Sequence, residues 1–175
     1  MLDTILRRRT TRKFLTKEVA DDTIVQLVQM AMFAPTRLGR RPWHFVIIRR
    51  PEIKRTLAER LRIEPDMVEA PAWVAVVADR KLTDAWDLDG AAATENLMIA
   101  ATAMGLGTAW IAAPVGPVWN KIDEVVGEAV RAPKDMGLVA LIAVGHAAEP
   151  APAKKPEDVY EQHRVHFERW GNTRG

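Results

Sequence analysis

The stretch from Gly90 to Met104 constrains the fold more than any other part of the chain. It reads GAAATENLMIAATAM, so a helix over these residues has small or apolar side chains on almost every side. A helix that is apolar all round must be covered by other elements. Gly105 and Gly107 follow it and favour the left-handed turn that ends a helix. We therefore expect a central helix here, either in the middle of the molecule or at a contact between subunits.

Four short apolar runs predict strands that lie between helices. The runs are bounded by turn-forming or charged residues, as is typical of buried strands, and they are Trp43–Ile48, Trp73–Ala78, Thr108–Ala112 and Leu138–Val144, the last of them central. Helix signals predict an N-terminal helix that ends in Arg7–Arg9, a helix over Thr23–Phe33 capped by Asp21 or Asp22, one from Pro51 to about Arg62, and one over Val118–Val126. A loop with Pro65 and Pro71 leads into the second strand.

The length and composition predict one domain over residues 1–175. The chain has 175 residues, of which 48% are hydrophobic, so it can bury a sizeable core. Ala147–Pro156 contains three prolines and is expected to be an extended connector. Beyond it, Val159, His163, Phe167 and Trp170 predict either one face of a C-terminal helix or an arm that reaches to a partner chain.

Several classes of site are excluded by missing residues. There is no cysteine, which removes disulfides, thiol nucleophiles and Cys-based metal sites. His163 and His166 have a spacing that suits a metal on a helix, but no carboxylate is in register, and a solvated or packed pair is the alternative. We expect no metal. Met1–Arg12 lacks the apolar core of a signal peptide, and no run is long enough to span a bilayer, so we expect a soluble, cytoplasmic protein without a membrane partner.

Charge is unevenly distributed along the chain. Residues 1–62 carry fifteen Lys or Arg and six Asp or Glu, while residues 63–175 carry ten and seventeen. A basic N-terminal third invites a polyanion, a phosphate or an acidic partner. At Arg7–Phe14, RRRTTRKF, the alternatives are a phosphate site, a solvated basic face and a nucleic-acid contact. Buried-element patterns interrupt the basic residues and aromatic interleaving is sparse, so we expect no nucleic-acid partner.

Four segments, taken in order, resemble the nitroreductase family of FMN-dependent oxidoreductases. The family's R-R-S-x-R-x-F run is matched by Arg8, Arg9, Thr10, Arg12 and Phe14, and its APS-x-x-N-x-QPW-x-F signature by Ala34, Pro35, Thr36, Pro42, Trp43 and Phe45. The third segment, Gly105–Ile111, matches G-L-G-T/S followed by W-I. The last match is a Gly-His strand end at Gly145 and His146, with a basic pair before P-x-D/E-V at residues 154–159. The resemblance covers roughly residues 2–160.

The resemblance implies a fold and an activity. The implied fold is α+β: a three-layer α/β/α sandwich with a mixed, mostly antiparallel central sheet surrounded by helices, in a homodimer. The implied activity is FMN-dependent transfer of hydride from NADH or NADPH through flavin N5 to nitroaromatics, quinones or enones by a ping-pong mechanism, with no catalytic side chain. Relatives of this fold also perform reductive dehalogenation or flavin breakdown, and an FMN-binding protein without turnover is a further alternative.

The resemblance also implies three groups of cofactor-binding residues. The phosphate and ribityl chain are expected near Arg8, Arg9, Thr10, Arg12, Lys154 and Lys155. One side of the flavin ring is expected along Trp110, Ile111, Ala112 and Ala113, with a backbone N–H of Ala112 or Ala113 near N5. A loop of the other subunit is expected to close the site with Pro35, Thr36, Arg37, Gly39 and Arg41.

Two positions depart from the family pattern. Gly39 and Arg41 stand where the family usually has Asn and Gln, and Arg41 is a candidate cationic donor to the pyrimidine edge of the flavin ring. Specificity for the acceptor is expected to lie in Arg62–Met67 and around Trp86.

Overall fold

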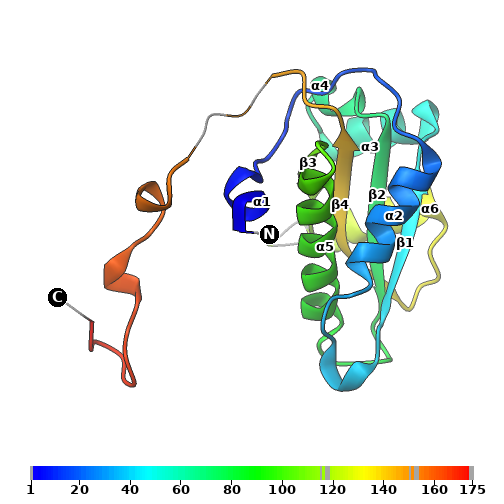
Figure 1. The fold of residues 1–175 in the computed structure, drawn as a ribbon. Helices are drawn as coiled ribbons and strands as arrows, with labels where there is room; N and C mark the ends of the chain where they lie inside the picture. The colour runs from blue at the N-terminus through cyan, green and yellow to red at the C-terminus, as the bar shows by residue number, and fades with distance from the viewer. Residues whose placement is uncertain (1, 115, 117–118, 150, 152–153, 174–175) are drawn as a thin grey trace.

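Four strands form one sheet at the centre of the structure (Figure 1), a computed structural model that describes residues 2–114, 116, 119–149, 151 and 154–173. The strand order is β1-β2-β4-β3, with β1 at Trp43–Ile48, β2 at Ala72–Asp79, β3 at Gly107–Ala112 and β4 at Met136–Gly145. All three pairings between these strands are antiparallel, and Thr10 and Thr108 add an isolated parallel bridge. The sheet is therefore mostly antiparallel, as expected.

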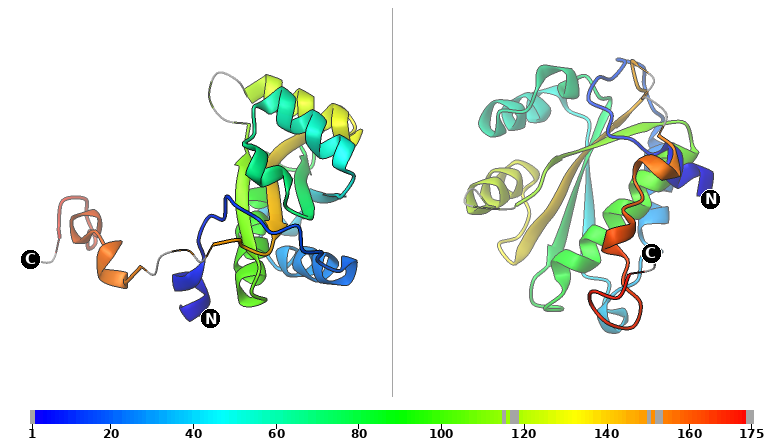
Figure 2. Two further views of the ribbon diagram at one scale, coloured as in Figure 1. Left: turned by 90° about the horizontal axis from the view of Figure 1, so that it is seen from above. Right: turned by 90° about the vertical axis from the view of Figure 1, so that its left-hand side faces the viewer.

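Helices cover both faces of this sheet. They are α1 at Leu2–Arg7, α2 at Asp21–Ala31, α3 at Pro51–Leu61, α4 at Pro65–Val68, α5 at Trp86–Ala103 and α6 at Trp119–Val130. Figure 2 shows α2 and α5 on one face and α3 and α6 on the other. This arrangement confirms the expected three-layer α/β/α sandwich.

The inner strands β2 and β4 supply both halves of the core. Val74 and Val76 pack with the cluster under α2 and α5, whereas Trp73 and Ala75 pack with the cluster under α3 and α6. Side chains along a strand alternate between the two faces, so a strand covered on both faces needs an uninterrupted apolar run. The bounds predicted for β1 are correct, but its burial is not. It is an edge strand, and His44 and Ile47 are exposed.

The central helix α5 is confirmed, with different ends. It begins at Trp86, four residues earlier than expected, and packs against α2 and β4. Gly105 follows it with a φ of 75°, and the Leu106 N–H donates to the carbonyl of Ala101 at 2.8 Å, which closes the last turn. Gly107 is the first residue of β3 and takes no part in this stop.

Other helix ends differ from the prediction. Asp21 and Asp22 lie inside the first turn of α2, which has no side-chain cap, so the predicted capping role is wrong. The first helix, α1, ends at Arg7, and Arg8 and Arg9 follow it as non-helical residues. The helix α2 stops at Ala31 instead of Phe33, and Pro65 opens a short helix instead of lying in a loop. The helix α6 runs to Val130 instead of Val126, and its expected first residue, Val118, lies outside the described residues. The start of α3 at Pro51 is as predicted.

The N-terminal segment pairs with the sheet through its main chain. The Thr11 N–H donates to the Thr108 carbonyl at 2.8 Å, and the Leu15 N–H donates to the His146 carbonyl at 2.9 Å. A third bond, from the Ala148 N–H to the Lys13 carbonyl, is 2.9 Å long. The residues after α1 and the residues after β4 therefore lie side by side, although they come from opposite ends of the sequence.

Beyond β4 the described residues contain no α-helix. They form two short 3₁₀ turns, at Pro156–Asp158 and Gln162–Arg164. Figures 1 and 2 show this segment leading away from the sheet, and its Trp170 side chain is 91% exposed. Within the described ranges, no helix combines the length and the apolar character needed to cross a membrane.

We predict that Gly107→Ala lowers the free energy of unfolding. A Cβ at this position falls 2.3 Å from Thr11 Oγ1 and 2.8 Å from Thr11 Cβ, so the N-terminal segment must move away from β3. Overpacking of this kind costs about 1–3 kcal/mol. The matched control is Gly127→Ala within α6, where a Cβ meets nothing within 4 Å; there alanine is expected to stabilise by about 0.5–1 kcal/mol. Urea denaturation measures both, and equal effects would contradict the prediction.

Lys54 is a buried cation that holds the chain between α4 and β2. Its side chain is 6% exposed, and its Nζ donates to the carbonyls of Val68 at 2.8 Å and Ala70 at 2.7 Å. Burial lowers the Lys54 pKa from the ordinary 10.5. A base with a lowered folded pKa contributes stability that is present above the unfolded pKa and is lost as pH falls through the folded pKa.

We predict that Lys54→Met destabilises the fold by about 1–3 kcal/mol because two buried carbonyls lose their donor. The difference in free energy of unfolding between Lys54→Met and the wild type should widen as pH rises toward 10.5. The control is Lys81→Met, since the hydrogen bond that Lys81 Nζ donates to Asp135 raises the Lys81 pKa. The stabilisation by the pair of Lys81 and Asp135 is present below pH 10.5 and is lost as pH rises through the raised pKa of Lys81 in the folded state. The difference in free energy of unfolding between Lys81→Met and the wild type should therefore shrink as pH rises. Urea denaturation over a pH series measures both trends, and a Lys54→Met difference that narrows with pH would be evidence against the assignment.

Candidate active site

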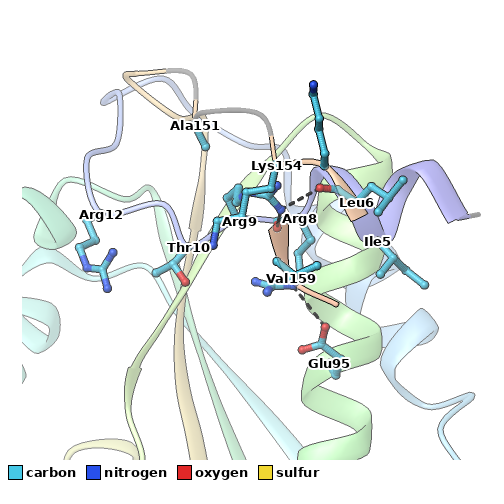
Figure 3. A pocket seen from close by; sticks show the side chains of 11 residues that line it. Ile5, Leu6, Arg8, Arg9, Thr10, Arg12, Glu95, Ala151, Lys154 and Val159 are labelled. Carbon is cyan, nitrogen blue, oxygen red and sulfur yellow. Dashed lines mark hydrogen bonds and ion pairs between the residues drawn. The ribbon is translucent and has the colours of Figure 1, made fainter. Parts of the chain in front are cut away.

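A basic cavity of about 560 Å³ opens between α1, α5 and the segment after β4 (Figure 3). Its lining comes from both ends of the chain and from the middle of α5, and comprises Ile5, Leu6, Arg8, Arg9, Thr10, Arg12, Glu95, Ala151, Lys154, Lys155 and Val159. All six residues expected near the phosphate and ribityl chain are in this set. The structure thus brings together residues that the sequence places in two distant motifs.

The cavity holds five cationic side chains and one carboxylate. Arg8 Nε lies 3.4 Å from Glu95 Oε1, which is the only charged residue of α5 after Asp89. Arg12 forms no ion pair with any residue that the structure describes. A surplus of positive charge in a concave site attracts an anion, and guanidinium groups suit the geometry of a phosphate.

Two polar groups at this cavity have no partner among the described residues. Arg9 Nη1 donates to the carbonyls of Leu6 and Arg8, both at 2.7 Å, while its Nε is buried without an acceptor. The hydroxyl of Thr108, which is bridged to Thr10 of the cavity, is also buried without a partner. Leaving a buried polar group without a hydrogen-bond partner costs free energy. A polar ligand bound in this cavity can supply the missing partner at these two positions.

A second, apolar cavity of about 250 Å³ lies at the start of α5 and the end of β3; we call it the slot. It is lined by Trp86, Asp87, Leu88, Ala91, Trp110, Ala113, Pro114, Leu138 and Val139. Of the four residues expected along the flavin ring, Trp110 and Ala113 line the slot. Ile111 and Ala112 do not, because they pack with the core under α3 and α6. A β-bulge between Trp110 and Ala112 interrupts the pairing with β4 here, and bulges often occur next to active sites.

Two elements connect the basic cavity to the slot. β3 passes from Thr108, beside the basic cavity, to Trp110, and Ala113 is the first residue after the strand. At roughly 3.3 Å per residue these positions are roughly 7–17 Å from Thr108. On α5, Glu95 lines the basic cavity, and Ala91, one turn earlier, lines the slot. The two cavities therefore lie one after the other along β3 and α5, the first basic and the second apolar.

The loop after α2 contributes no lining residue to either cavity. Its predicted site residues line neither of them, and they are Pro35, Thr36, Arg37, Gly39 and Arg41. Figure 1 shows the loop at the bottom of the view, near the first turn of α5 and away from α1. The expected site is thus divided within one chain into three groups, of which two come together.

Asp89 anchors this loop. The side chain is buried, and its Oδ1 accepts the Arg37 N–H at 2.9 Å. Arg37 Nε also pairs with Asp84 at 3.0 Å. Leu38, Gly39 and Arg41 have φ values of 52°, 67° and 51°, an unusual density of left-handed backbone. Asp89 escaped the sequence analysis because an acidic residue in the first turn of a helix is ordinarily solvated.

The remaining expectations are placed as follows. Arg62–Met67 lies at the end of α3 and in α4 and lines neither the basic cavity nor the slot. Among the described residues there is no group of three or more potential metal ligands. The His166 ring packs on Trp170 with the centroids 4.3 Å apart, and His163 Nε2 lies 3.5 Å from Glu161.

Glu95 was not among the predicted site residues, although a lone charged residue within an apolar helix is a signal that could have pointed to it.

Comparisons with known proteins agree with this geometry. The nitroreductase family model matches residues 5–87 and 63–146. A protein of Archaeoglobus fulgidus, described as a candidate NADH dehydrogenase/NAD(P)H nitroreductase, is 28% identical over 173 residues that cover 97% of this chain and 98% of that protein. A crystal structure from Bacteroides thetaiotaomicron with the same description has a TM-score of 0.88 at 28% identity and covers 96% of each chain. A candidate nitroreductase of Desulfovibrio desulfuricans, solved in complex with FMN, has a TM-score of 0.75 at 25% identity and covers 89% of this chain and 91% of that one. The chain belongs to the nitroreductase family.

Proposed function

We propose that this protein is an FMN-dependent oxidoreductase that transfers hydride from NADH or NADPH to electron-poor acceptors such as nitroaromatics, quinones and enones. The observation that carries the proposal is that a basic cavity and an apolar slot lie along the same two elements, β3 and α5; we take them together as one elongated site. FMN has the same polarity, with a phosphate at one end and a flat ring system at the other. The FMN complex of the Desulfovibrio desulfuricans relative supports this choice of cofactor.

The residues of the basic cavity fit the phosphate end of FMN. Arg8, Arg9 and Arg12 supply guanidinium donors, and Lys154 and Lys155 add charge from the other wall. The buried Arg9 Nε and the Thr108 hydroxyl are unpartnered donors in the same region. Each charge-assisted hydrogen bond to the phosphate is worth about 1.5–3 kcal/mol before desolvation.

The residues at the other end fit the ring. Trp110 and Ala113 offer an apolar surface, and Leu138 and Val139 line the slot with them. The main chain at Ala112 and Ala113 is the proposed donor to the ring nitrogen at which hydride arrives. Bound FMN supplies the redox chemistry by accepting hydride from the nicotinamide and passing it to the acceptor in a ping-pong cycle, so the protein needs no catalytic side chain.

We place the site at the interface of a homodimer. The loop from Pro35 to Arg41 lines neither the basic cavity nor the slot of its own chain, so on this proposal it is available to a second subunit. Large apolar side chains are exposed nearby, with Phe33 at 79%, Leu38 at 82% and Leu88 at 70% exposure. Exposed apolar patches of this kind are typical of protein interfaces. The exposed segment with Trp170 is, on this proposal, an arm that contacts the same partner.

Arg41 retains its proposed role at the pyrimidine edge of the partner's flavin. Its φ of 51° is supported by a 3.3 Å hydrogen bond from its N–H to Thr36 Oγ1. The side chain is exposed and forms no ion pair with a described residue, so it is free to meet a ligand. An Arg41→Gln variant with unchanged flavin affinity and redox potential would contradict this role.

The first experiment records the visible spectrum of the purified protein. The expected result is a yellow protein that is bleached by NADH or NADPH without oxygen and regains its colour with a quinone. A protein that stays colourless after incubation with FMN would overturn the proposal. A coloured protein that neither nicotinamide reduces would indicate FMN binding without turnover.

We predict that Arg12→Ala weakens FMN binding by about tenfold or more, which corresponds to about 1.4 kcal/mol, because the phosphate loses a donor. Titration of the protein freed of flavin with FMN, followed by flavin fluorescence, measures the affinity. The control is Arg60→Ala, an exposed arginine paired with Glu128 at 2.8 Å on the opposite face of the sheet, which should leave the affinity unchanged. An Arg12→Ala affinity within twofold of the wild type would show that the phosphate binds elsewhere.

A further prediction concerns the assembly. Sedimentation equilibrium should give twice the chain mass of 19.6 kDa. Dilution to the monomer should release FMN, because each site on this proposal lacks its loop in a single chain. A monomer that retains FMN with full affinity is the result that would contradict the shared site.

A further inference from the structure

Trp86 forms a wall of the slot at the end away from the basic cavity. It is the first residue of α5 and lies nine residues before Glu95, so roughly 13 Å along the helix axis at 1.5 Å per residue. Trp110 is the second aromatic residue of the lining, and most of the remaining lining is aliphatic. The Trp86 end of the slot therefore extends past the part of β3 that adjoins the basic cavity.

Arg80 supports Trp86 from outside the slot. Its guanidinium carbon lies 5.4 Å from the centroid of the Trp86 ring, and Arg80 is not part of the slot lining. The guanidinium also pairs with Asp123 of α6. Asp123 in turn accepts the N–H of Leu138, a slot residue, through Oδ1 at 2.7 Å. A planar guanidinium suits both a carboxylate and an aromatic face, so Arg80 fixes the Trp86 ring relative to β4.

Gly137 shows how closely these groups are packed. A Cβ at this position lies 2.6 Å from both Arg80 Nε and Trp86 Cζ3. The absence of a side chain on β4 at this point is what lets the arginine and the indole ring approach the strand. The position of Trp86 is thus determined from two sides.

The charge of the slot is limited to one residue. Among the described residues that line the slot, Asp87 is the only ionisable side chain, and the cation behind Trp86 is already paired with Asp123. An anionic ligand in the slot would meet a carboxylate and no compensating cation.

We propose that the Trp86 end of the slot binds the flat, uncharged aromatic ring of the acceptor, and that Arg80 is a positioning residue that holds Trp86 as its wall. The carboxylate of Asp87 then disfavours the binding of anionic aromatic acceptors in the slot. The proposal rests on the proposed function for the transfer of hydride to this ring, but the binding of the ring itself can be measured without turnover.

The first test compares steady-state kinetics of the holoenzyme with a neutral acceptor, 2-methyl-1,4-naphthoquinone, and an anionic one, 1,2-naphthoquinone-4-sulfonate. Arg80→Met should raise the KM for the neutral quinone at least about fivefold, leave FMN affinity within about twofold, and change kcat less than KM. Arg80→Lys keeps the cation and should restore part of the effect. Arg60→Met is the matched control, because Arg60 of α3, like Arg80, pairs with a carboxylate of α6, here Glu128, and does not line the slot.

Asp87→Asn tests the selectivity separately. It should lower the KM for the sulfonate at least about threefold and leave the KM for the neutral quinone within about twofold. Equal changes for both quinones would overturn the role of Asp87. If Arg80→Met instead weakens FMN binding as much as it raises the KM, the flavin ring itself reaches the Trp86 end of the slot and the acceptor assignment is wrong. An unchanged KM in Arg80→Met would likewise overturn the positioning role.

A second test does not depend on flavin. Binding of 2-methyl-1,4-naphthoquinone to the purified protein is followed by quenching of tryptophan fluorescence, with Trp86→Phe and Arg80→Met as variants. If the protein binds no FMN but the quinone binds and both variants weaken it, the proposed function fails and the slot assignment stands. If FMN binds and is reduced but the quinone neither quenches nor responds to these variants, the slot assignment fails alone.

Discussion

Main-chain pairing of the N-terminal segment with β3 and with the residues after β4 is the constraint on which the site depends. The bonds from Thr11 to Thr108 and from Leu15 to His146 place the arginines after α1 beside the segment that carries Lys154 and Lys155. Backbone hydrogen bonds of this kind fix a register, so the basic side chains of the two motifs converge, and an ion pair between Lys13 and Glu149 at 3.0 Å adds to these contacts. Gly107 makes the close approach of Thr11 to β3 sterically allowed. The charge that gathers here is thus a consequence of how the two ends of the chain add to one edge of the sheet.

The elongated shape of the site follows from two elements that run between its ends. β3 connects Thr108 to Trp110, and α5 connects Glu95 to Ala91, so each element contributes to the basic cavity and to the slot. The apolar character of α5 lets it serve both as core and as the floor of this site. Its one charged residue after Asp89 faces the arginines, where the charge has a partner in Arg8. The same element therefore accounts for stability and for the polarity that the proposed cofactor requires.

Much of the fold could be predicted from local patterns. The bounds of β1, the start of α3 at Pro51 and the central position of α5 follow from apolar runs, proline geometry and small side chains. The errors occur where a local pattern has more than one tertiary outcome. Asp21 and Asp22 are good caps, yet the chain enters α2 one residue earlier, at Ala20. The apolar run of β1 suggests full burial, but a strand at the edge of the sheet keeps one flank open, and His44 and Ile47 are exposed.

By itself the sequence determined the types of element, the buried helix and the two basic motifs, because periodicity, turn residues and charge act over a few neighbouring positions. The tertiary structure decided which of these meet. It joined Arg8 and Arg12 to Lys154 in one cavity and left the loop from Pro35 to Arg41 outside it. It also set Arg80 against Trp86 and Asp123, a contact among three elements that no local pattern reports. Such contacts depend on strand order and register, which are properties of the whole chain folded against itself.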